Sequence, residues 1–333
     1  MPPAISETLH RLCCALRTLL GVLTAACVFG VPVHAQDWPK KPVRIVSPFA
    51  PGGGSDVMAR ILADSLSQRL HQQFFVENRG GAGGLIGSAY VANAAPDGYT
   101  FVISSIGTHV IAPATSASPA YDPIASFIHV AYVGGPPTVI VVNPALGVRS
   151  FGEFLALIKT RREPLPYVSP GPGTVGNLLA EVWAEREGVK LAHVAYKGAG
   201  QAVTDLVAGH VQMGSMTWTA ALGQVQAKAL VPLAVSSARR MPGFAEVPTL
   251  RELGYGDLTV TTWFGFAAPS GLPPAITLRM NQEIAASLET PAVRDRLIAE
   301  GFELETMSPQ EFTRFVAGEI AKWGPIAKRL VGG

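Results

Sequence analysis

The most constraining feature of the sequence is a strand–turn–helix pattern between residues 43 and 70. β-Branched residues predict a buried strand, because such side chains fit a pleated, covered surface: Val43, Ile45 and Val46. Apolar residues then recur at three- and four-residue steps, so they share one face of a helix: Val57, Met58, Ile61, Leu62, Leu66 and Leu70. The intervening turn, residues 48–56, contains three consecutive glycines and offers Ser55 as the expected N-cap.

Such a turn directs several backbone N–H groups toward one point, and the dipole of the following helix adds positive potential there. The pattern therefore indicates a receptor for an anion at Gly52-Gly53-Gly54. The alternative is a tight connection whose glycines only permit positive φ angles. This segment is compatible with both.

The rest of the chain alternates predicted strands and helices, which is typical of α/β proteins. Strands expected at 74–76 and 99–104 enclose a helix at 82–94, and this βαβαβ order predicts a parallel sheet with covered faces. A second glycine-containing loop, residues 169–174, again connects a strand to a helix. Ligands of open α/β sheets bind beyond the carboxyl ends of strands, so the two loops could grip one ligand across a cleft. Any α/β protein has several such turns, and the two loops could also be unrelated.

The first 35 residues have the composition of a cleaved signal peptide. An almost wholly apolar run, Thr18 to Val33, is followed by the small-residue pattern Val33-His34-Ala35, which predicts cleavage before Gln36. The run is shorter than the ~20 residues that span a bilayer, although an uncleaved N-terminal anchor is the alternative. A lipoprotein signal at Cys27 lacks the usual large apolar residue three positions earlier. We expect an exported, periplasmic protein that is long enough for two lobes.

Composition and motifs argue against catalysis and against several kinds of partner. Cys13, Cys14 and Cys27 all lie in the leader, so the mature chain would have no disulfide, reactive thiolate or cysteine-bound metal. The formal net charge of +2 comes without a basic patch, so nucleic acid is not an expected partner. There is no G-x-S-x-G elbow or Walker lysine, and the histidines lack metal-ligand spacing. We expect no catalytic residue, no metal and no cofactor.

Short motifs occur in a fixed order along the chain: Trp38 to Val46, Pro48 to Asp56, Val76 to Arg79, Gly81 to Gly84, Ala95 to Thr100, Gly107 to His109, Tyr121 to Pro123, Tyr196 to Gly198, Val247 to Thr249, Trp263 to Gly265 and Glu319 to Trp323. The ordered set covers nearly all of the mature chain. It resembles the receptors of tripartite tricarboxylate transporters, also called Bug receptors.

The resemblance implies a periplasmic solute-binding protein of the α/β class with the two-lobe, type II "Venus flytrap" fold, each lobe a mixed sheet flanked by helices. Lobe I would comprise residues 36–107 and 233–333, and lobe II residues 108–232. Such a receptor, expected as a monomer, captures a small carboxylate in the inter-lobe cleft and delivers it to integral-membrane transporter subunits. A periplasmic ligand sensor with a membrane signalling partner would have the same pocket, and a secreted α/β enzyme is a further alternative.

The same resemblance implies that backbone amides, hydroxyls and bridging water hold the carboxylate, rather than an arginine. The implied ligand-binding residues lie in three loops: Phe49, Ala50, Gly52, Gly53, Gly54 and Ser55 in the first; Ser105, Thr108 and His109 after the third strand; Ser169, Gly171, Gly173, Thr174 and Asn177 in the second lobe. His109 could instead be an ordinary loop histidine. Trp263 and Phe264 could line the cleft or pack in the core.

Departures from the family pattern concern specificity. Pro170 and Pro172 stiffen the second-lobe loop, and Val175 stands where the family commonly has a hydroxyl. Asn177 replaces a histidine, and the pair Met216-Thr217 replaces a frequent acidic–amide pair. With fewer hydroxyls and no acid, we expect a carboxylate with an apolar or aromatic body in preference to a zwitterionic amino acid.

Overall fold

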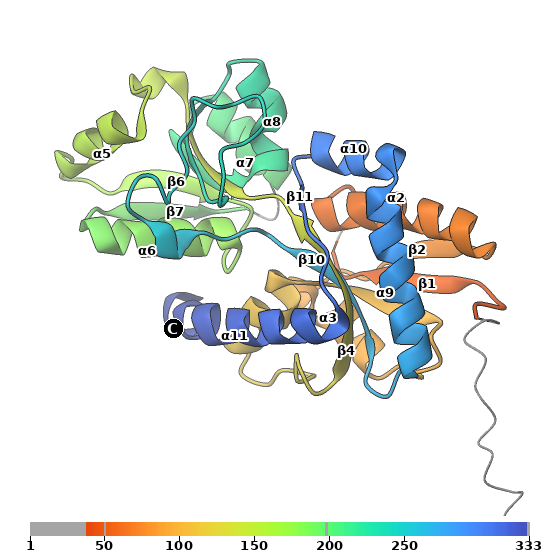
Figure 1. Ribbon diagram of the computed structural model, residues 1–333. Helices are drawn as coiled ribbons and strands as arrows, with labels where there is room; N and C mark the ends of the chain where they lie inside the picture. Colours follow the sequence, from red (N-terminus) through yellow and green to blue (C-terminus); the bar gives the residue numbers. More distant parts are fainter. Residues whose placement is uncertain (1–37, 50, 197–198, 332–333) are drawn as a thin grey trace, which may run out of the picture. The chain divides into compact units, whose positions relative to one another are not determined.

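The computed structural model describes residues 38–49, 51–196 and 199–331. The expected signal peptide, its cleavage site, the candidate site residue Ala50 and the motif residues Lys197 and Gly198 lie outside the described residues. Pro39–Gly333 form one compact unit. Its strands form two mixed sheets, and helices flank each of them (Figure 1). The predicted α/β class and its division into two sheets are confirmed.

The first sheet has six strands in the order β11-β4-β10-β3-β1-β2. They are β1 (Val43–Ser47), β2 (Phe74–Asn78), β3 (Thr100–Ser105), β4 (Phe127–Gly135), β10 (Phe264–Pro269) and β11 (Glu303–Leu304). β1 pairs in parallel with β2 and β3, as the βαβαβ pattern predicts, whereas β10 is antiparallel to β3 and β4. β1 has strand neighbours on both sides and is almost entirely buried, which explains its run of β-branched residues.

The helices that accompany this sheet come from both ends of the chain: α2 (Gly54–Leu70), α3 (Leu85–Ala92), α4 (Ala112–Thr115), α9 (Pro274–Glu289), α10 (Pro291–Ala299) and α11 (Pro309–Val331). Two short helical turns, η2 (Ala82–Gly84) and η3 (Gly107–Ile111), precede α3 and α4. The predicted apolar face of α2 is buried except at Val57, which is partly exposed. The burial of this face fixes the orientation of α2, so its N-terminus lies at the carboxyl end of β1.

The second sheet has five strands in the order β7-β6-β8-β5-β9. They are β5 (Thr138–Val142), β6 (Leu165–Ser169), β7 (Leu191–Ala195), β8 (Met213–Thr217) and β9 (Val231–Val235). β6 is parallel to β7 and β8, while β5 is antiparallel to β8 and β9. The associated helices are α5 (Phe151–Lys159), α6 (Val175–Glu187), α7 (Ala199–Val207) and α8 (Trp218–Gln226). The short turns η4 (Pro144–Leu146) and η5 (Gly256–Leu258) lie in connections.

The chain passes between the sheets twice, first between β4 and β5 and again between β9 and β10. A bridge between Pro137 and Thr261 joins the two crossing segments. β4 belongs to the first sheet, although the expected boundaries include it in lobe II, and β9 straddles the expected boundary at residue 233. The chain therefore leaves the first sheet at residues 136–137 and returns to it between residues 236 and 263.

Two helices and two strands have no clear signal in the sequence pattern: α8, α10, β8 and β11. β8 lies in the interior of its sheet, paired with β5 and β6, yet it contains Gly214 and Ser215, which have low strand propensity. Pairing on both sides, and not local preference, produces this strand.

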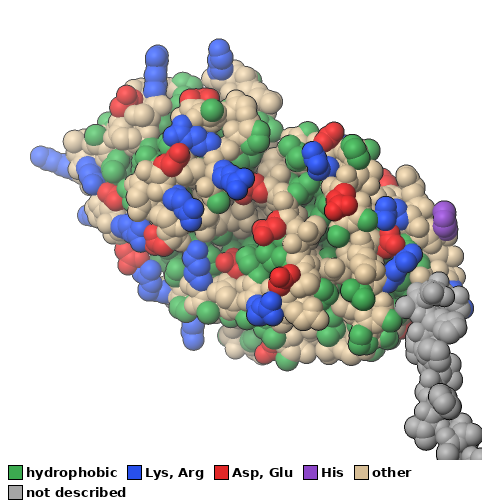
Figure 2. All heavy atoms as spheres, viewed as in Figure 1, with side chains coloured by type: hydrophobic (Ala, Val, Ile, Leu, Met, Phe, Trp, Pro, Cys, Tyr) green, Lys and Arg blue, Asp and Glu red, His purple; other side chains and the backbone are tan. Residues whose placement is uncertain are grey.

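The core contains four fully buried tryptophans: Trp183, Trp218, Trp263 and Trp323. Trp183 belongs to α6 and Trp323 to α11. Both side chains pack in one apolar cluster, which also includes residues of the crossing segments such as Trp263. On the face shown in Figure 2, acidic and basic side chains are interspersed, without a patch of a single sign.

Candidate binding cleft

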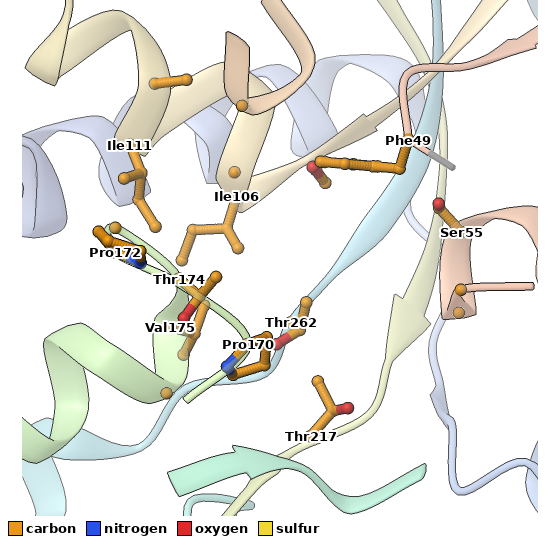
Figure 3. Close-up of a pocket in the computed structure, with 18 of the residues that line it drawn as sticks. Phe49, Ser55, Ile106, Ile111, Pro170, Pro172, Thr174, Val175, Thr217 and Thr262 are labelled. Atoms are coloured by element: carbon orange, nitrogen blue, oxygen red, sulfur yellow. The ribbon is translucent and has the colours of Figure 1, made fainter. Parts of the chain in front are cut away.

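A cavity of about 500 Å³ lies where loops of both sheets meet. Its walls come from the connections that follow β1, β2, β3 and β6, from the last residue of β8, and from the crossing segment that leads into β10 (Figure 3). The lining residues are Phe49, Gly53, Gly54, Ser55, Ala82, Gly83, Leu85, Ser105, Ile106, Gly107, Ile111, Ala112, Thr115, Ser116, Pro170, Pro172, Gly173, Thr174, Val175, Gly176, Thr217, Thr262 and Phe264. The two loops selected from the sequence thus border the same cavity.

The first wall contains the N-terminus of α2. Gly53 is its N-cap, with φ −80° and ψ 167°, and no side chain caps the helix. The expectation that Ser55 is the N-cap is therefore wrong, because the helix begins at Gly54. Ser55 lies in the first turn, where an N–H group has no acceptor four residues earlier within the helix. No acceptor for the Ser55 N–H is found among the described residues.

Asp56 holds the turn before α2 in place. Its carboxylate accepts a hydrogen bond from the Gly52 N–H at 3.0 Å and pairs with Arg60, and Asn78 donates to it at 2.9 Å. Burial alone would raise the pKa of Asp56, but these hydrogen bonds hold it below its ordinary value of 3.8. The carboxylate is therefore ionised near neutral pH and fully engaged with protein donors.

The second wall contains the N-terminus of α6, which is capped by a side chain. Thr174 Oγ1 accepts from the Asn177 N–H at 3.4 Å and donates to the Gly171 carbonyl at 2.8 Å. The N–H groups of Val175 and Gly176 belong to the first turn, and neither has an acceptor among the described residues. A Cβ at Gly176 would lie 2.2 Å from the Ser215 carbonyl oxygen, so this end of α6 is pressed against β8.

A buried hydrogen-bond network supports the α6 loop from below. Asn177 Oδ1 accepts from the Gly173 N–H at 3.0 Å, and Asn177 Nδ2 donates to the Tyr167 hydroxyl at 2.8 Å. Tyr167 in turn donates to Glu181 at 2.6 Å. Asn177 does not line the cavity, so its side chain shapes the loop instead.

The electrostatics of the cavity come from the backbone. None of the described lining residues carries a charged side chain. The N-termini of α2 and α6 both face it, and each contributes unpaired N–H groups and the positive end of a helix dipole. The arrangement suits an anionic group that accepts hydrogen bonds.

Thr108 and His109 lie behind the cavity wall. Thr108 Oγ1 accepts from the Ser105 N–H at 3.0 Å and lies 2.9 Å from His109 Nδ1. His109 is fully buried and its ring centre is 4.7 Å from that of Phe127. Burial, with a smaller contribution from nearby His129, lowers the pKa of His109 well below 6.5, so its ring is neutral near pH 7.

The candidate residues thus divide into two groups. Those that line the cavity are Phe49, Gly53, Gly54, Ser55, Ser105, Gly173 and Thr174. Those that lie outside its lining are Gly52, Thr108, His109, Ser169, Gly171 and Asn177. In the second group, Ser169 Oγ is 2.8 Å from His193 Nε2 and donates to the Gly171 carbonyl.

Several lining residues were not among the candidates, and Thr217 and Thr262 are the most informative. Thr217 ends β8, which the sequence pattern does not predict, and Thr262 lies in a crossing segment. Pro170, Pro172 and Val175 also line the cavity; the sequence marks them as departures from the family pattern, but not as candidate site residues. Phe264 lines the cavity, whereas Trp263 is fully buried and donates to Glu319 at 3.0 Å.

The described part of the chain contains no cluster of three or more His, Cys, Asp or Glu residues placed to hold a metal ion. Within residues 38–49, 51–196 and 199–331, no helix has the length and apolar character needed to cross a membrane.

Comparison with known proteins identifies the class. The structure of R. palustris Rpa4515 with adipate superposes with a TM-score of 0.81 and 34% sequence identity, over 88% of this chain and 98% of that chain. The structure of MatC from Rhodopseudomonas palustris with bound malate gives a TM-score of 0.75 and 27% identity, over 87% and 100%. Together with the two-sheet fold and the cleft, these likenesses define a two-lobe solute-binding receptor.

The family follows from the sequence comparisons. The family model described as "Tripartite tricarboxylate transporter family receptor" matches residues 58–331. Protein BugT of Bordetella pertussis (strain Tohama I) is 34% identical over 315 residues, which cover 94% of this chain and 96% of that protein. The chain belongs to the tripartite tricarboxylate transporter receptor family, as the ordered motifs predicted.

Proposed function

We infer that this protein is a periplasmic receptor that captures a small organic carboxylate in the cleft and delivers it to membrane subunits of a tripartite transporter. One observation carries the inference: the N-termini of α2 and α6 face a single cavity whose described lining contains no charged side chain. Their first-turn N–H groups are donors for a carboxylate. The adipate and malate in the structures of the two relatives support this class of ligand.

The ligand-binding residues that we propose are six candidates on the cavity wall: Phe49, Gly53, Gly54, Ser55, Ser105 and Gly173. Ser55 contributes both its N–H and its hydroxyl. The remaining described candidates shape the loops, as Asn177 does through the Gly173 N–H. The protein acts without a cofactor, and it binds rather than transforms its ligand.

Capture proceeds by closure of the two loops around the ligand. A carboxylate first accepts hydrogen bonds from one helix N-terminus while the cleft is wet. Approach of the other loop excludes water, and each N–H···O⁻ bond then strengthens in the lower dielectric. The ligand favours the closed form only by its differential affinity for that form. The closed receptor is the form that the membrane subunits accept.

A thermal-shift screen tests the carboxylate assignment. The protein, purified after export of the full chain, is heated with mono-, di- and tricarboxylates, with amino acids, and with neutral sugars as controls. A carboxylate at about 100 times its Kd should add about 2.7 kcal/mol to the unfolding free energy, which raises Tm visibly. If the folded protein responds to no carboxylate, or responds to the neutral controls, the proposal is wrong.

Export is tested independently of binding. We propose that residues 1–35 are a signal peptide and that the periplasmic protein begins at Gln36. N-terminal sequencing of protein recovered from the periplasmic fraction should read Gln36-Asp37-Trp38. A chain that still begins at Met1 in the membrane fraction would instead indicate an anchored receptor.

A further inference from the structure

The turn that leads into α6 is held by a chain of hydrogen bonds that begins outside the cavity, at His193. This residue lies in β7, and its ring centre is 4.9 Å from that of Tyr167 in β6. Its Nε2 atom is 2.8 Å from Oγ of Ser169, which ends β6 and is fully buried. His193 itself is partly exposed, so its ring can exchange protons with the solvent. A titratable side chain at the surface is thus bonded to a buried hydroxyl next to the α6 turn.

Ser169 connects His193 to the backbone of Gly171. Ser169 Oγ accepts from the Gly171 N–H at 3.2 Å and donates to the Gly171 carbonyl at 3.0 Å. A hydroxyl has only one hydrogen, so His193 is the donor in its own bond with Ser169. The neutral ring of His193 therefore carries its proton on Nε2.

The Gly171 carbonyl joins this chain to the cap of α6. It accepts from the Thr174 hydroxyl at 2.8 Å and from the Thr174 N–H at 3.3 Å. A Cβ at Gly171 would lie 3.0 Å from the Tyr196 carbonyl oxygen, so the turn also rests on the segment that follows β7. These contacts fix where the cap of α6 lies, and with it the unpaired N–H groups of Val175 and Gly176 that face the cavity.

Two titratable groups of the described chain face the His193 ring: Glu181 on α6 and Tyr167 on β6. Burial lowers the pKa of His193 below its ordinary value of 6.5, and the negative charge of Glu181 opposes this effect. Burial and Glu181 together raise the pKa of Tyr167, so its phenol stays protonated and donates to Glu181. β7 is the edge strand of its sheet. The ring is therefore neutral near pH 7 and gains a charge when the solution is acidified.

We propose that His193 is a positioning residue for carboxylate binding: through Ser169 it holds the α6 turn in place, and its protonation strengthens the binding of the anion. This inference rests on the proposed function. The Nε2–H group is present in the neutral and in the charged ring, so acidification keeps the chain of hydrogen bonds and adds a positive charge behind the turn. Because the coupling is reciprocal, a bound carboxylate favours the charged ring, and the protein takes up protons when it binds.

Three variants of the exported protein test the positioning role. His193→Leu removes the donor to Ser169 and should raise Kd about fivefold at pH 7.5, as for one lost hydrogen bond. His193→Gln brings an amide N–H group to the place of Nε2 and should recover most of that loss. Ser169→Ala should weaken binding about as much as His193→Leu, and the double variant no further, because both act through one hydroxyl. Additive losses would overturn the assignment.

Isothermal titration calorimetry with adipate, malate and benzoate between pH 8 and pH 5.5 tests the proton dependence. On acidification, Kd of the parent should fall about threefold relative to Kd of His193→Gln, and this comparison cancels the titration of the acids themselves. In buffers of different protonation enthalpy, binding to the parent should take up more protons than binding to His193→Gln. His210→Gln is the control and should behave like the parent, because His210 is exposed and pairs with Asp205.

The outcomes separate this inference from the proposed function. If His193→Leu binds the acids with the parent Kd, or if the ratio between the parent and His193→Gln stays constant with pH, the inference is wrong while the carboxylate receptor stands. If none of the three acids binds the folded parent at any pH, the proposed function is contradicted, and this inference with it.

Discussion

The two loops that border the cleft look alike in sequence and are built differently. Each follows a strand, contains glycines and leads into a helix whose N-terminus faces the cavity. The α2 loop has no side-chain cap and is held by the buried carboxylate of Asp56. The α6 loop is capped by Thr174 and held by neutral groups, chiefly Asn177 and Tyr167.

The difference decides what each hydroxyl can do. In α6 the hydroxyl of Thr174 satisfies its own helix, so it has no donor left for a ligand. In α2 the glycine cap leaves the hydroxyl of Ser55 almost unused. One loop therefore offers backbone N–H groups alone, and the other offers N–H groups and a side chain. The same kind of turn therefore produces a hydroxyl that caps its own helix at α6 and a hydroxyl with one long contact at α2.

The largest expected effect is a difference in unfolding free energy between alanine substitutions at the first-turn glycines of α6 and α2. In Gly176→Ala, the new Cβ would lie 2.2 Å from the Ser215 carbonyl oxygen, so α6 must move away from β8. We expect a loss of about 3 kcal/mol of unfolding free energy, as for overpacked sites. Gly54→Ala is the matched control, because its Cβ would meet the Phe264 ring at 3.6 Å, an ordinary contact.

Urea denaturation of both variants measures this difference. Gly54→Ala should keep the stability of the parent within about 1 kcal/mol, since alanine loses less conformational entropy on folding and meets no obstacle. Equal destabilisation of the two variants would mean that the starts of α2 and α6 are equally crowded. The two loops would then not differ in how closely they are packed.

The second effect concerns the charge that holds the α2 loop. Asp56→Asn keeps the shape but weakens the hydrogen bonds from Gly52 and Arg60, and we expect a loss of about 2 kcal/mol at pH 7. The pKa of Asp56 is lower in the folded chain than its ordinary value of 3.8. Its contribution to stability is therefore fully present above pH 3.8 and is lost as the pH falls through the folded value.

Unfolding free energies at pH 7 and at pH 3 check both statements. The parent and Asp56→Asn should differ most at pH 7 and converge as the solution is acidified. Asn177→Asp is the matched control in the α6 loop. It adds a charge where the neutral side chains of Asn177 and Tyr167 hold the loop. A constant difference between the parent and Asp56→Asn at both pH values would show that the carboxylate is not the stabilising species.

The sequence predicts the scaffold of the cleft well, but not the details of its wall. Hydrophobic periodicity locates α2, and glycine spacing locates both loops, because these signals are local. Capping depends on which backbone N–H a side chain reaches, and this is set by the exact start of the helix. The sequence pattern points to Ser55 as the N-cap of α2, whereas the helix begins at Gly54 and Gly53 is its N-cap. The sequence marks Thr217 only as a departure from the family pattern, because its place on the wall depends on β8, which forms by pairing with its two neighbouring strands.

The third effect tests the cap of α6. Thr174→Val removes the oxygen that accepts from the Asn177 N–H and should cost about 1 kcal/mol of unfolding free energy. Thr174→Ser retains that oxygen and should stay close to the parent. Chemical denaturation followed by circular dichroism measures both. If serine fails to rescue the loss, then the methyl group of Thr174, and not its cap, stabilises the loop.

The smallest effect on stability is expected at Ser55, and it is also the most specific. Ser55→Ala removes a hydroxyl whose single contact, with Ser47, is long, so the unfolding free energy should change by less than about 0.5 kcal/mol. A hydrogen bond to a charged ligand contributes about 1.5 kcal/mol or more, so carboxylate affinity should fall about tenfold. Thr174→Ser gives the complementary control, with a parent-like Kd. If Ser55→Ala left the Kd unchanged, the α2 loop would bind through its backbone alone, and the two loops would be equivalent toward the ligand.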